Sequence, residues 1–410
     1  MPYIQRAITP ILKQRVSTSK CMLLVGARQV GKSTLIKHEF KDFNRANFDD
    51  RLTRMQAKEE PKLFFLNNPK PLFIDEVQKE SSIFEDIKQI VDESDERGMF
   101  ILSGSQKLEL MKGMSESLAG RVSISELTGL SMREIYGVKF NRHFIPTDAY
   151  IKEREKEIVK YDNLWEIIHK GSYPELYDID RDWQEYYSSY VATYLERDIN
   201  ELVAADGITF TKFLTAVAAR TGELLNYSNI AGEVGVSEPT IKNWISILER
   251  TGIVYLLQPY SASALKRAIK TPKLYFRDTG LACYLTRWLT ADTLKFSAVA
   301  GNMFETFVVS EILKSYTNEG KDYRFNIFYY RGKDRNASGE NEIDLVIEED
   351  GVLYPVEIKM SGNPKASMGA TNQVLDKVSD KKRGLGVILC LIDKKTYLRE
   401  NLVALPIEFI

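Results

Sequence analysis

The sequence predicts an α/β multidomain protein, and three patterns carry this prediction. A short apolar segment runs into a glycine-rich loop and a helix at residues 22–34, two helices and a strand follow one another at 227–258, and two strands pair at 341–359. At 410 residues the chain is too long for one hydrophobic core. We therefore expect several domains, each built around one of these patterns.

Composition limits the classes of function. The chain has 56 Lys and Arg against 57 Asp and Glu, so no global positive field points to nucleic acid, and any such contact depends on local patches. No apolar run reaches the roughly 18 residues of a membrane helix, and no secretory leader is evident. We expect a cytoplasmic protein with no membrane partner, whose three widely spaced cysteines are small core residues.

Residues 26–34 read GARQVGKST, which is the GxxxxGK[ST] pattern of a phosphate-binding loop. Gly26 and Gly31 let the backbone N–H groups turn inward toward phosphates, at the start of the helix that Lys32 opens. Lys32 would bind the β- and γ-phosphates, and Ser33 would bind Mg²⁺. A plain glycine turn between strand and helix is the alternative, which the apolar strand before the loop disfavours. The residues expected to contact a nucleoside triphosphate are Gly26, Ala27, Arg28, Gln29, Val30, Gly31, Lys32, Ser33 and Thr34.

A second phosphate-site element follows 42 positions after Ser33. Residues 71–76 read PLFIDE, an apolar strand that ends in two carboxylates. Asp75 would hold Mg²⁺ through water, and Glu76 would orient and polarise the attacking water. A strand that merely ends in solvated acids is the alternative, which the spacing from the loop disfavours.

Two further positions are candidates for sensing the γ-phosphate. Residues 98–106 predict a buried strand with polar residues at its tip, where Ser105 or Gln106 would position water. An ordinary strand-to-helix turn is the alternative for this tip. Arg121 precedes a strand expected at 123–127, and a single arginine in such a place is usually a surface charge.

The set GARQVGKST, FIDEVQ, ILSGSQ and LAGR resembles the AAA+-type ATPase domain of bacterial and archaeal fused ATPases, over roughly residues 1–140. The resemblance implies binding and hydrolysis of ATP with Mg²⁺. It also implies that Arg121 reaches a γ-phosphate, which in some members belongs to a neighbouring subunit. There the arginine would stabilise the negative charge of the transferred phosphoryl group.

The middle of the chain reads as a helical connection followed by a winged helix-turn-helix. Residues 141–225 are charged, aromatic and helical in spacing, and 226–290 give helix, turn, helix and strand. Ser228 and Ser237 are the expected helix caps. A DNA partner would meet the outward face of the second helix, although winged helices also bind proteins. That face consists of Thr240, Lys242, Asn243 and Ser246.

Two neighbouring stretches support this interpretation. Residues 261–277 hold five basic side chains and no acid, which suits phosphate contact but also describes a solvated surface. Residues 273–281, KLYFRDTGL, resemble the same fused family and lead toward the last domain.

Residues 291–410 predict a third kind of site. Asp344 lies on one strand, and Glu357 and Lys359 share a face of the next strand after a turn. Two close carboxylates attract a hard divalent cation such as Mg²⁺, and Lys359 would stabilise developing charge or activate water.

This D…ExK pattern resembles the PD-(D/E)XK nuclease superfamily, with Ile343 in place of the proline. Glu305, on a predicted amphipathic helix, matches the acid that the superfamily often supplies from its first helix. The resemblance implies a PD-(D/E)XK-like α/β domain in which Glu305, Asp344 and Glu357 hold the metal. Polar residues on a half-buried sheet, or a scaffold that only binds, remain the alternatives.

Two functional interpretations follow from the sequence. In the first, an ATPase couples its nucleotide state to DNA through the winged helix, and the nuclease-like module cuts or clamps. In the second, the ATPase is a regulatory switch whose C-terminal modules bind a protein partner or form a homo-oligomer.

Overall fold

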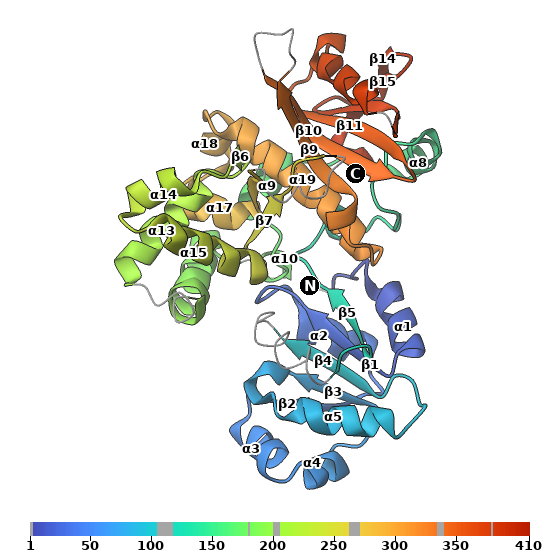
Figure 1. Ribbon diagram of the computed structural model, residues 1–410, viewed down its shortest axis with the longest axis vertical. Helices are drawn as coiled ribbons and strands as arrows, with labels where there is room; N and C mark the ends of the chain where they lie inside the picture. The colour runs from blue at the N-terminus through green and yellow to red at the C-terminus, as the bar shows by residue number, and fades with distance from the viewer. Residues whose placement is uncertain are drawn as a thin grey trace.

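The structure is a computed structural model that describes residues 3–104, 118–178, 181–199, 206–261, 271–333, 340–378 and 380–410. Its strands form sheets of five, three and seven strands. Figure 1 shows the N-terminal sheet at one end of the molecule and the seven-stranded sheet at the other, with the middle helices to one side. The predicted mixed α/β class is confirmed. Within the described ranges, no helix has both the length and the apolar character needed to cross a bilayer.

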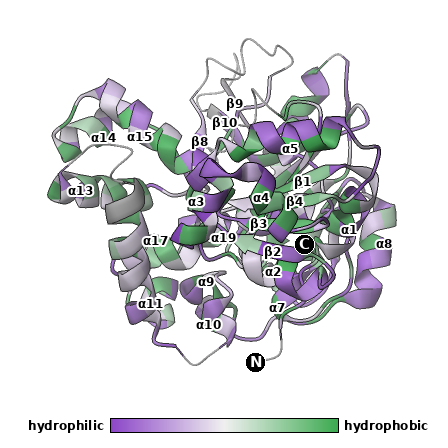
Figure 2. Cartoon of the chain, turned by 90° about the horizontal axis from the view of Figure 1, so that it is seen from below, coloured by the Kyte–Doolittle hydropathy of each residue, from purple (hydrophilic) through white to green (hydrophobic). Residues whose placement is uncertain are grey.

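The N-terminal sheet is parallel, in the order β2-β3-β4-β1-β5. Every residue of β1, β3 and β4 is buried, as expected for strands covered on both faces, and Figure 2 colours β1 and β4 mainly as apolar. The strands are β1 (Cys21–Val25), β2 (Asn44–Asn47), β3 (Leu72–Asp75), β4 (Phe100–Gly104) and β5 (Val122–Glu126). The helices are α1 (Thr9–Thr18), α2 (Lys32–Glu39), α3 (Arg51–Glu59), α4 (Pro61–Asn67), η1 (Val77–Glu80) and α5 (Ile83–Asp92).

Strand β4 lies between β1 and β3, and this order positions the candidate site. The register pairs Leu24 with Ser103 and Ile74 with Leu102. Because the strands are parallel, their carboxyl ends meet at the same edge of the sheet. The loop after β1 and the acids after β3 therefore face each other across the end of β4.

The central part is helical and rich in buried tyrosines. Tyr186, Tyr187 and Tyr190 are buried along α11, which continues into a π-helical stretch. The elements are α7 (Met132–Ile135), α8 (Asp148–Arg154), η2 (Glu155–Glu157), α9 (Leu164–Lys170), α10 (Glu175–Asp178), α11 (Trp183–Tyr190) and η3 (Val191–Ile199).

Three helices and a small antiparallel sheet follow, with the strand order β6-β8-β7. The elements are α13 (Gly207–Ala218), β6 (Glu223–Leu224), α14 (Tyr227–Val234), α15 (Glu238–Arg250), β7 (Val254–Leu257) and β8 (Lys273–Phe276). The predicted apolar face of the second helix is confirmed, since α15 buries Ile241, Trp244, Ile245 and Leu248.

One of the two predicted caps is wrong. The carboxamide of Asn226, not Ser228, accepts the capping hydrogen bond from the Asn229 N–H, and Ser228 lies inside α14. An asparagine side chain caps at least as well as serine, so the helix begins two residues earlier than predicted. Ser237 caps α15 as predicted, accepting from the Thr240 N–H.

In the C-terminal part, one long helix packs against a seven-stranded sheet. Strands β9, β10 and β11 are antiparallel neighbours, and β11, β13 and β15 run parallel. The helices are α17 (Thr279–Leu285), α18 (Ala291–Lys295), α19 (Ala300–Asn318), η4 (Tyr323–Phe325), η5 (Ala366–Lys377) and η6 (Ile407–Phe409). The strands are β9 (Ile327–Lys333), β10 (Glu340–Glu349), β11 (Val352–Lys359), β12 (Lys382–Arg383), β13 (Gly386–Cys390), β14 (Thr396–Arg399) and β15 (Leu402–Pro406).

Helix α19 joins this sheet to the N-terminal part of the chain. The sequence predicts an amphipathic helix here, but α19 is buried on nearly all sides. Glu311 accepts a hydrogen bond from the Met132 N–H at 2.8 Å, and Lys314 Nζ donates to Leu130 O at 2.9 Å. Its charged residues are therefore used to hold neighbouring backbone, which the sequence pattern alone does not reveal.

Candidate functional site

The phosphate loop leaves the end of β1 and turns into α2. Gly26 has φ +156° and Gly31 has φ +94°, backbone conformations that favour glycine. A Cβ at Gly26 would lie 2.2 Å from Leu127 O, so the loop is pressed against the chain that follows β5. The Leu127 N–H also donates to Val25 O at 2.8 Å. The loop is thus fixed at its start by sterics as well as by hydrogen bonding.

Lys32 is folded back onto its own loop. Its Nζ donates to Gly26 O and to Ala27 O, each at 2.9 Å, and the side chain is buried. Burial lowers the pKa of the ammonium to about 8, against the opposing effect of Glu76 and Asp75. The lysine charge is held by neutral carbonyl oxygens, which an incoming phosphate can replace.

The two predicted acids lie at the end of β3, beside this lysine. Asp75 is buried, and its Oδ1 accepts hydrogen bonds from the Ser103 hydroxyl and, at 3.2 Å, from the Glu76 N–H. Glu76 has φ +53° and accepts from Gln78 Nε2 at 2.5 Å. Gln78 Oε1 is buried with no hydrogen-bond partner among the described residues. A hydroxyl, a carboxylate and a free amide oxygen are oxygen ligands of the kind that Mg²⁺ prefers.

The remaining loop residues take different positions. Arg28 lies over the ring of Tyr194, 5.8 Å from its centroid, and Gln29 has φ +65°. Ser33 is half-buried at the start of α2, and Thr34 is exposed. The loop therefore already contacts the helical middle through Arg28.

Two sensor candidates, Ser105 and Gln106, lie outside the described residues. The polar residue of β4 that meets the site is instead Ser103, which is fully buried and donates to Asp75. Sequence reasoning missed it, although its place in the third buried strand is the available signal.

Arg121 lies away from the nucleotide site of its own chain. It immediately precedes β5, whose register pairs Val122 with Cys21 and Glu126 with Val25. In a parallel sheet this places Arg121 at the amino edge, opposite the phosphate loop. Its guanidinium forms a bidentate ion pair with Asp92 at 2.5 and 2.9 Å. Because a strand's length separates the two edges, Arg121 does not reach the phosphate loop of its own chain in this arrangement, and contact with a neighbouring subunit's nucleotide stays a prediction.

Arg6, which lies outside the GxxxxGK[ST] motif, holds the phosphate loop in place. Its guanidinium donates to Val30 O at 2.8 Å and to Thr128 O at 2.7 Å, and pairs with Glu134 at 3.0 Å. The side chain is 4% exposed. Sequence reasoning missed this residue, and no local pattern marks it, since its partners are far away in the chain.

The C-terminal acids meet across two strands. The register of β10 and β11, in which Leu345 pairs with Val356, places Asp344 opposite Glu357 when it is extended by one position. Asp344 Oδ2 accepts from the Ile358 N–H and from Lys359 Nζ, each at 2.8 Å, and Lys359 Nζ lies 2.8 Å from Glu357 Oε2. Glu357 Oε1 is buried without a hydrogen-bond partner in the described part of the chain.

The charges of this cluster shift each other. Burial, reinforced by the charge of Asp344, raises the pKa of Glu357 to about 8. Burial disfavours the charged form of Lys359, but Asp344 and Glu357 outweigh it and raise the lysine pKa above its ordinary value. Lys359 is therefore the counter-ion of the two carboxylates within this cluster.

Glu305 does not complete a three-carboxylate metal site. Its Oε1 accepts from the Tyr275 hydroxyl at 2.6 Å and from Lys273 Nζ at 3.3 Å, and Lys273 also pairs with Glu342 at 2.6 Å. No group of three His, Cys, Asp or Glu within the described ranges is arranged to hold a metal ion. The prediction that Glu305, Asp344 and Glu357 form one metal site is therefore not met in this arrangement, because β8 supplies a lysine and a tyrosine to Glu305.

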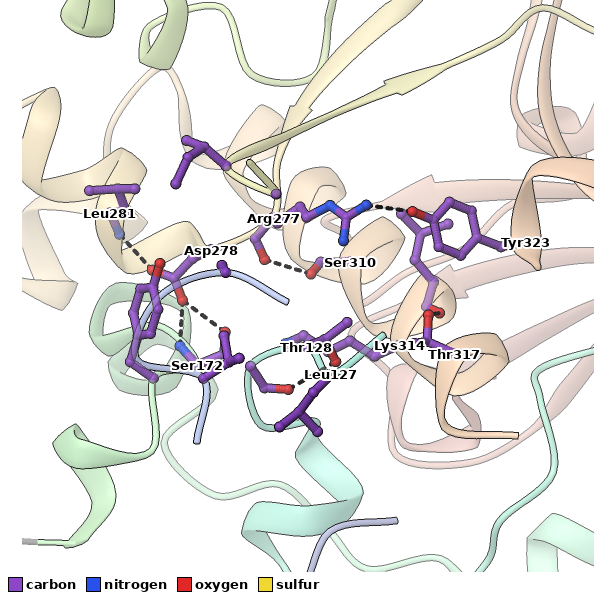
Figure 3. Close-up of a pocket in the computed structure, with 17 residues that line it drawn as sticks. Leu127, Thr128, Ser172, Arg277, Asp278, Leu281, Ser310, Lys314, Thr317 and Tyr323 are labelled. Carbon is purple, nitrogen blue, oxygen red and sulfur yellow. Dashed lines mark hydrogen bonds between the residues drawn. The ribbon is translucent and has the colours of Figure 1, made fainter. Parts of the chain in front are cut away.

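Strand β8 and the residues after it connect this cluster to the ATPase part. Arg277 pairs with Glu126 at 2.7 Å and donates to the Tyr323 hydroxyl at 2.5 Å. Asp278 accepts from the Ser172 N–H at 2.6 Å and from the Tyr187 hydroxyl at 2.6 Å. Four of them line a small cavity of about 40 Å³ at the junction, and Figure 3 shows them: Ser172, Arg277, Asp278 and Tyr323.

Three family models match separate segments of the chain. Residues 18–136 match an AAA domain. Residues 161–292 and 300–410 match two domains of unknown function, DUF8612 and DUF4143. The chain therefore carries an AAA-type, ATP-binding ATPase domain joined to two domains of unknown function.

Similar proteins give no further role. Uncharacterised proteins of Mycobacterium tuberculosis and Mycobacterium bovis are each 28% identical over 375 residues, which is 89% of this chain and 76% of theirs. Among solved structures, a RuvB variant of Thermotoga maritima is 17% identical with a TM-score of 0.26, covering 60% of this chain and 85% of its own. Drosophila ORC bound to DNA is 13% identical with a TM-score of 0.23, covering 68% and 85%. TM-scores this low do not establish a common arrangement.

Proposed function

We propose that this protein is an AAA-type ATPase whose nucleotide state controls DNA engagement by a winged helix-turn-helix and by a PD-(D/E)XK-like acid cluster. One observation carries the proposal: the phosphate loop lies beside the turn before β7, and β7 pairs with β8, which supplies the two residues that hold Glu305. A Cβ at Gly252 would lie 3.6 Å from Ala27 Cβ. The next residue, Ile253, accepts a hydrogen bond from the Arg277 N–H at 3.0 Å.

ATP binding would begin with a change at Lys32. The lysine exchanges the two carbonyl oxygens of its own loop for phosphate oxygens, which form stronger, charge-assisted hydrogen bonds. Ser33 and Asp75 would hold the Mg²⁺ that accompanies ATP, and this ion supplies charge neutralisation at the phosphates. Glu76 orients the attacking water.

The nucleotide signal would then travel through packed contacts. Release of Lys32 frees the carbonyl of Ala27, the residue against which Gly252 lies. From there the contacts run through Arg277 into β8, where Tyr275 and Lys273 hold Glu305. An effect of ATP on DNA binding or cleavage is the expected consequence.

The winged-helix assignment rests on element order. The elements follow one another as α13, β6, α14, α15, β7 and β8. This order of helix, strand, helix, helix, strand, strand is that of a winged helix-turn-helix. On α15, Lys242 and Asn243 are exposed and Thr240 and Ser246 are partly exposed, so this face is available to DNA backbone or base edges.

The nuclease-like assignment rests on α19, the antiparallel β9-β10-β11 strands and the parallel β13. Asp344 and Glu357 lie opposite each other, and Glu357 Oε1 is free to bind a cation. Their oxygens suit Mg²⁺, which would polarise a phosphodiester there. Lys359 Nζ would leave these carboxylates and stabilise the negative charge that develops on the phosphorane.

A second candidate function has its own support. Lys242 is paired with Glu238 of the same helix at 2.7 Å, which leaves little free positive charge on the outward face of α15. A regulatory ATPase whose C-terminal modules bind a protein partner, or a second copy of this chain, would need no DNA contact. Arg121 would then serve a neighbouring subunit's nucleotide.

Cleavage is tested with plasmid, linear duplex and single-stranded DNA in Mg²⁺ or Mn²⁺. We expect cutting by the wild type and by Lys365→Ala, an exposed lysine six positions away, but not by Lys359→Ala. Equal cutting by Lys359→Ala would remove the nuclease assignment.

Binding is tested by a salt series on DNA affinity, with and without ATP. A steep salt dependence that Lys242→Ala reduces supports the winged helix, and a flat slope supports the protein-partner function. If Lys32→Ala responds to ATP as the wild type does, the proposed coupling is wrong.

A further inference from the structure

A cleft with several basic side chains lies next to Val25, just before the phosphate loop. It has a volume of about 510 Å³, within the usual range of small-molecule sites. Its walls come from α1 and β5, from the end of α15 with β7, and from the end of α19 with residues 320–324. Val25, the last residue before the phosphate loop, also lines it, but Lys32, Ser33 and Asp75 do not.

The lining of the cleft is rich in cations. Five basic side chains face three carboxylates, and Glu349 outside the lining neutralises one more of the cations, which leaves an excess of one positive charge. A net positive lining favours an anion such as a phosphate monoester, which carries roughly 1.5 to 2 negative charges at neutral pH. The five cations are Arg15, Arg250, Arg277, Lys321 and Arg324.

Three of these cations are neutralised within the protein. Arg277 pairs with Glu126 at 2.7 Å, and Arg324 with Asp322 at 2.6 Å. Lys321 pairs at 3.1 Å with Glu349, outside the lining. Although Arg277 is paired through its terminal nitrogens, its Nε is buried with no hydrogen-bond partner in the described part of the chain.

The other two cations have no carboxylate partner among the described residues. Arg15 donates to Ile124 O at 2.6 Å, to the Ser125 hydroxyl at 2.7 Å and to Gly320 O at 2.9 Å, all of which are neutral. Arg250, at the end of α15, is exposed and forms no side-chain hydrogen bond or ion pair with any described residue. Arg15 is therefore held in place while Arg250 is free to bind a ligand.

We infer that this cleft binds a phosphate group carried on a small organic ligand, at a site separate from the phosphate loop. A guanidinium presents donors that match phosphate oxygens, and arginines on two walls can engage one phosphate together. The apolar wall formed by Ile8, Ile124 and Tyr255 suits the organic part of the ligand. A free mononucleotide and the phosphorylated end of a nucleic-acid strand share this chemistry. The inference does not depend on the proposed DNA function.

The test uses Lys32→Ala as background, so that the phosphate loop contributes little. Adenosine 5′-monophosphate and adenosine are titrated calorimetrically at low salt. We expect saturable binding of the monophosphate only. Arg250→Gln should weaken it about tenfold, the effect of one charge-assisted hydrogen bond of about 1.4 kcal/mol. Lys62→Gln, at an exposed lysine of α4 outside the cleft, is the matched control and should have no effect.

The Arg250 side chain has no polar contact with the described residues to lose, so its substitution should not disturb folding. If Lys32→Ala itself folds poorly, titration of the wild type replaces it, with two monophosphates bound per chain and, in Arg250→Gln, one of the two bound about tenfold more weakly. Absence of saturable binding, or equal affinity in Arg250→Gln and Lys62→Gln, would overturn the inference. A 5′-phosphorylated dinucleotide that binds more tightly than the mononucleotide identifies a nucleic-acid end, and equal affinity identifies a free nucleotide.

Discussion

Two lysines next to carboxylate pairs behave differently in the two halves of this molecule. Lys32 donates to two backbone carbonyl oxygens at 2.9 Å each, and burial lowers its pKa to about 8. Lys359 donates to two carboxylates at 2.8 Å each, which raise its pKa in spite of burial.

The difference indicates what each site is prepared to bind. The charge of Lys32 has no carboxylate ion-pair partner among the described residues, so an anion can take it without breaking an ion pair. The charge of Lys359 is already neutralised, and a metal ion or a phosphodiester must displace it. We therefore expect ATP to bind readily at the first site, while the second site needs its ion pair opened.

The largest expected effect separates chemistry from binding at the first site. Glu76→Gln removes the carboxylate that orients water, so hydrolysis should fall about 100- to 1,000-fold while ATP affinity changes little. Turnover and equilibrium binding of labelled ATP measure the two quantities. Glu85→Gln, an exposed glutamate of α5, is the control. Unchanged turnover in Glu76→Gln would exclude this carboxylate from catalysis.

Lys32→Ala tests the binding half of the comparison. Loss of the charge-assisted hydrogen bonds to phosphate should weaken ATP about 100-fold. Lys37→Ala, on the exposed side of the same helix, should bind as the wild type does. If the two variants bind ATP equally, Lys32 is not the phosphate-binding cation.

At the second site, pH should affect stability in a defined direction. The pKa of Glu357 is raised to about 8 in the folded protein from the ordinary 4.5. Between these values the folded state binds more protons than the unfolded state, so stability falls as pH rises through this window. The decrease in melting temperature from about pH 5 to about pH 8 should be smaller in Glu357→Gln. Parallel curves for wild type and variant would show that Glu357 is not perturbed.

Much of both sites follows from local sequence. The phosphate loop is predictable because its glycines and its lysine act within nine residues of backbone. The pairing of Asp344 with Glu357 is predictable because a tight turn fixes the register of two adjacent strands.

Other parts depend on packing between distant segments. Arg6 and Ser103 meet the first site only after the chain has folded. Lys273 and Tyr275 reach Glu305 of α19 from the three-stranded sheet, which spacing cannot show. The family resemblance places Arg121 at the γ-phosphate, whereas a residue that precedes a parallel strand lies at the opposite edge from the loop.

The smallest expected effect concerns Arg121. Its exposed ion pair with Asp92 contributes little to stability, so Arg121→Ala should leave the melting temperature and ATP affinity nearly unchanged. Arg97→Ala is a matched exposed control. Hydrolysis that falls in Arg121→Ala and depends on protein concentration would instead place this arginine in a neighbour's site.

The pH dependence of ATP affinity tests the central contrast most directly. A bound phosphate keeps Lys32 protonated. In the free enzyme Lys32 loses its proton above a pKa of about 8, so ATP binding above that pH must be accompanied by uptake of a proton. Equilibrium titration of labelled ATP should therefore give constant affinity below about pH 8, apart from the phosphate titration near pH 6 to 7, and a decrease of up to tenfold per pH unit above it. An affinity that stays flat to about pH 10, or an absence of saturable ATP binding, would contradict this account.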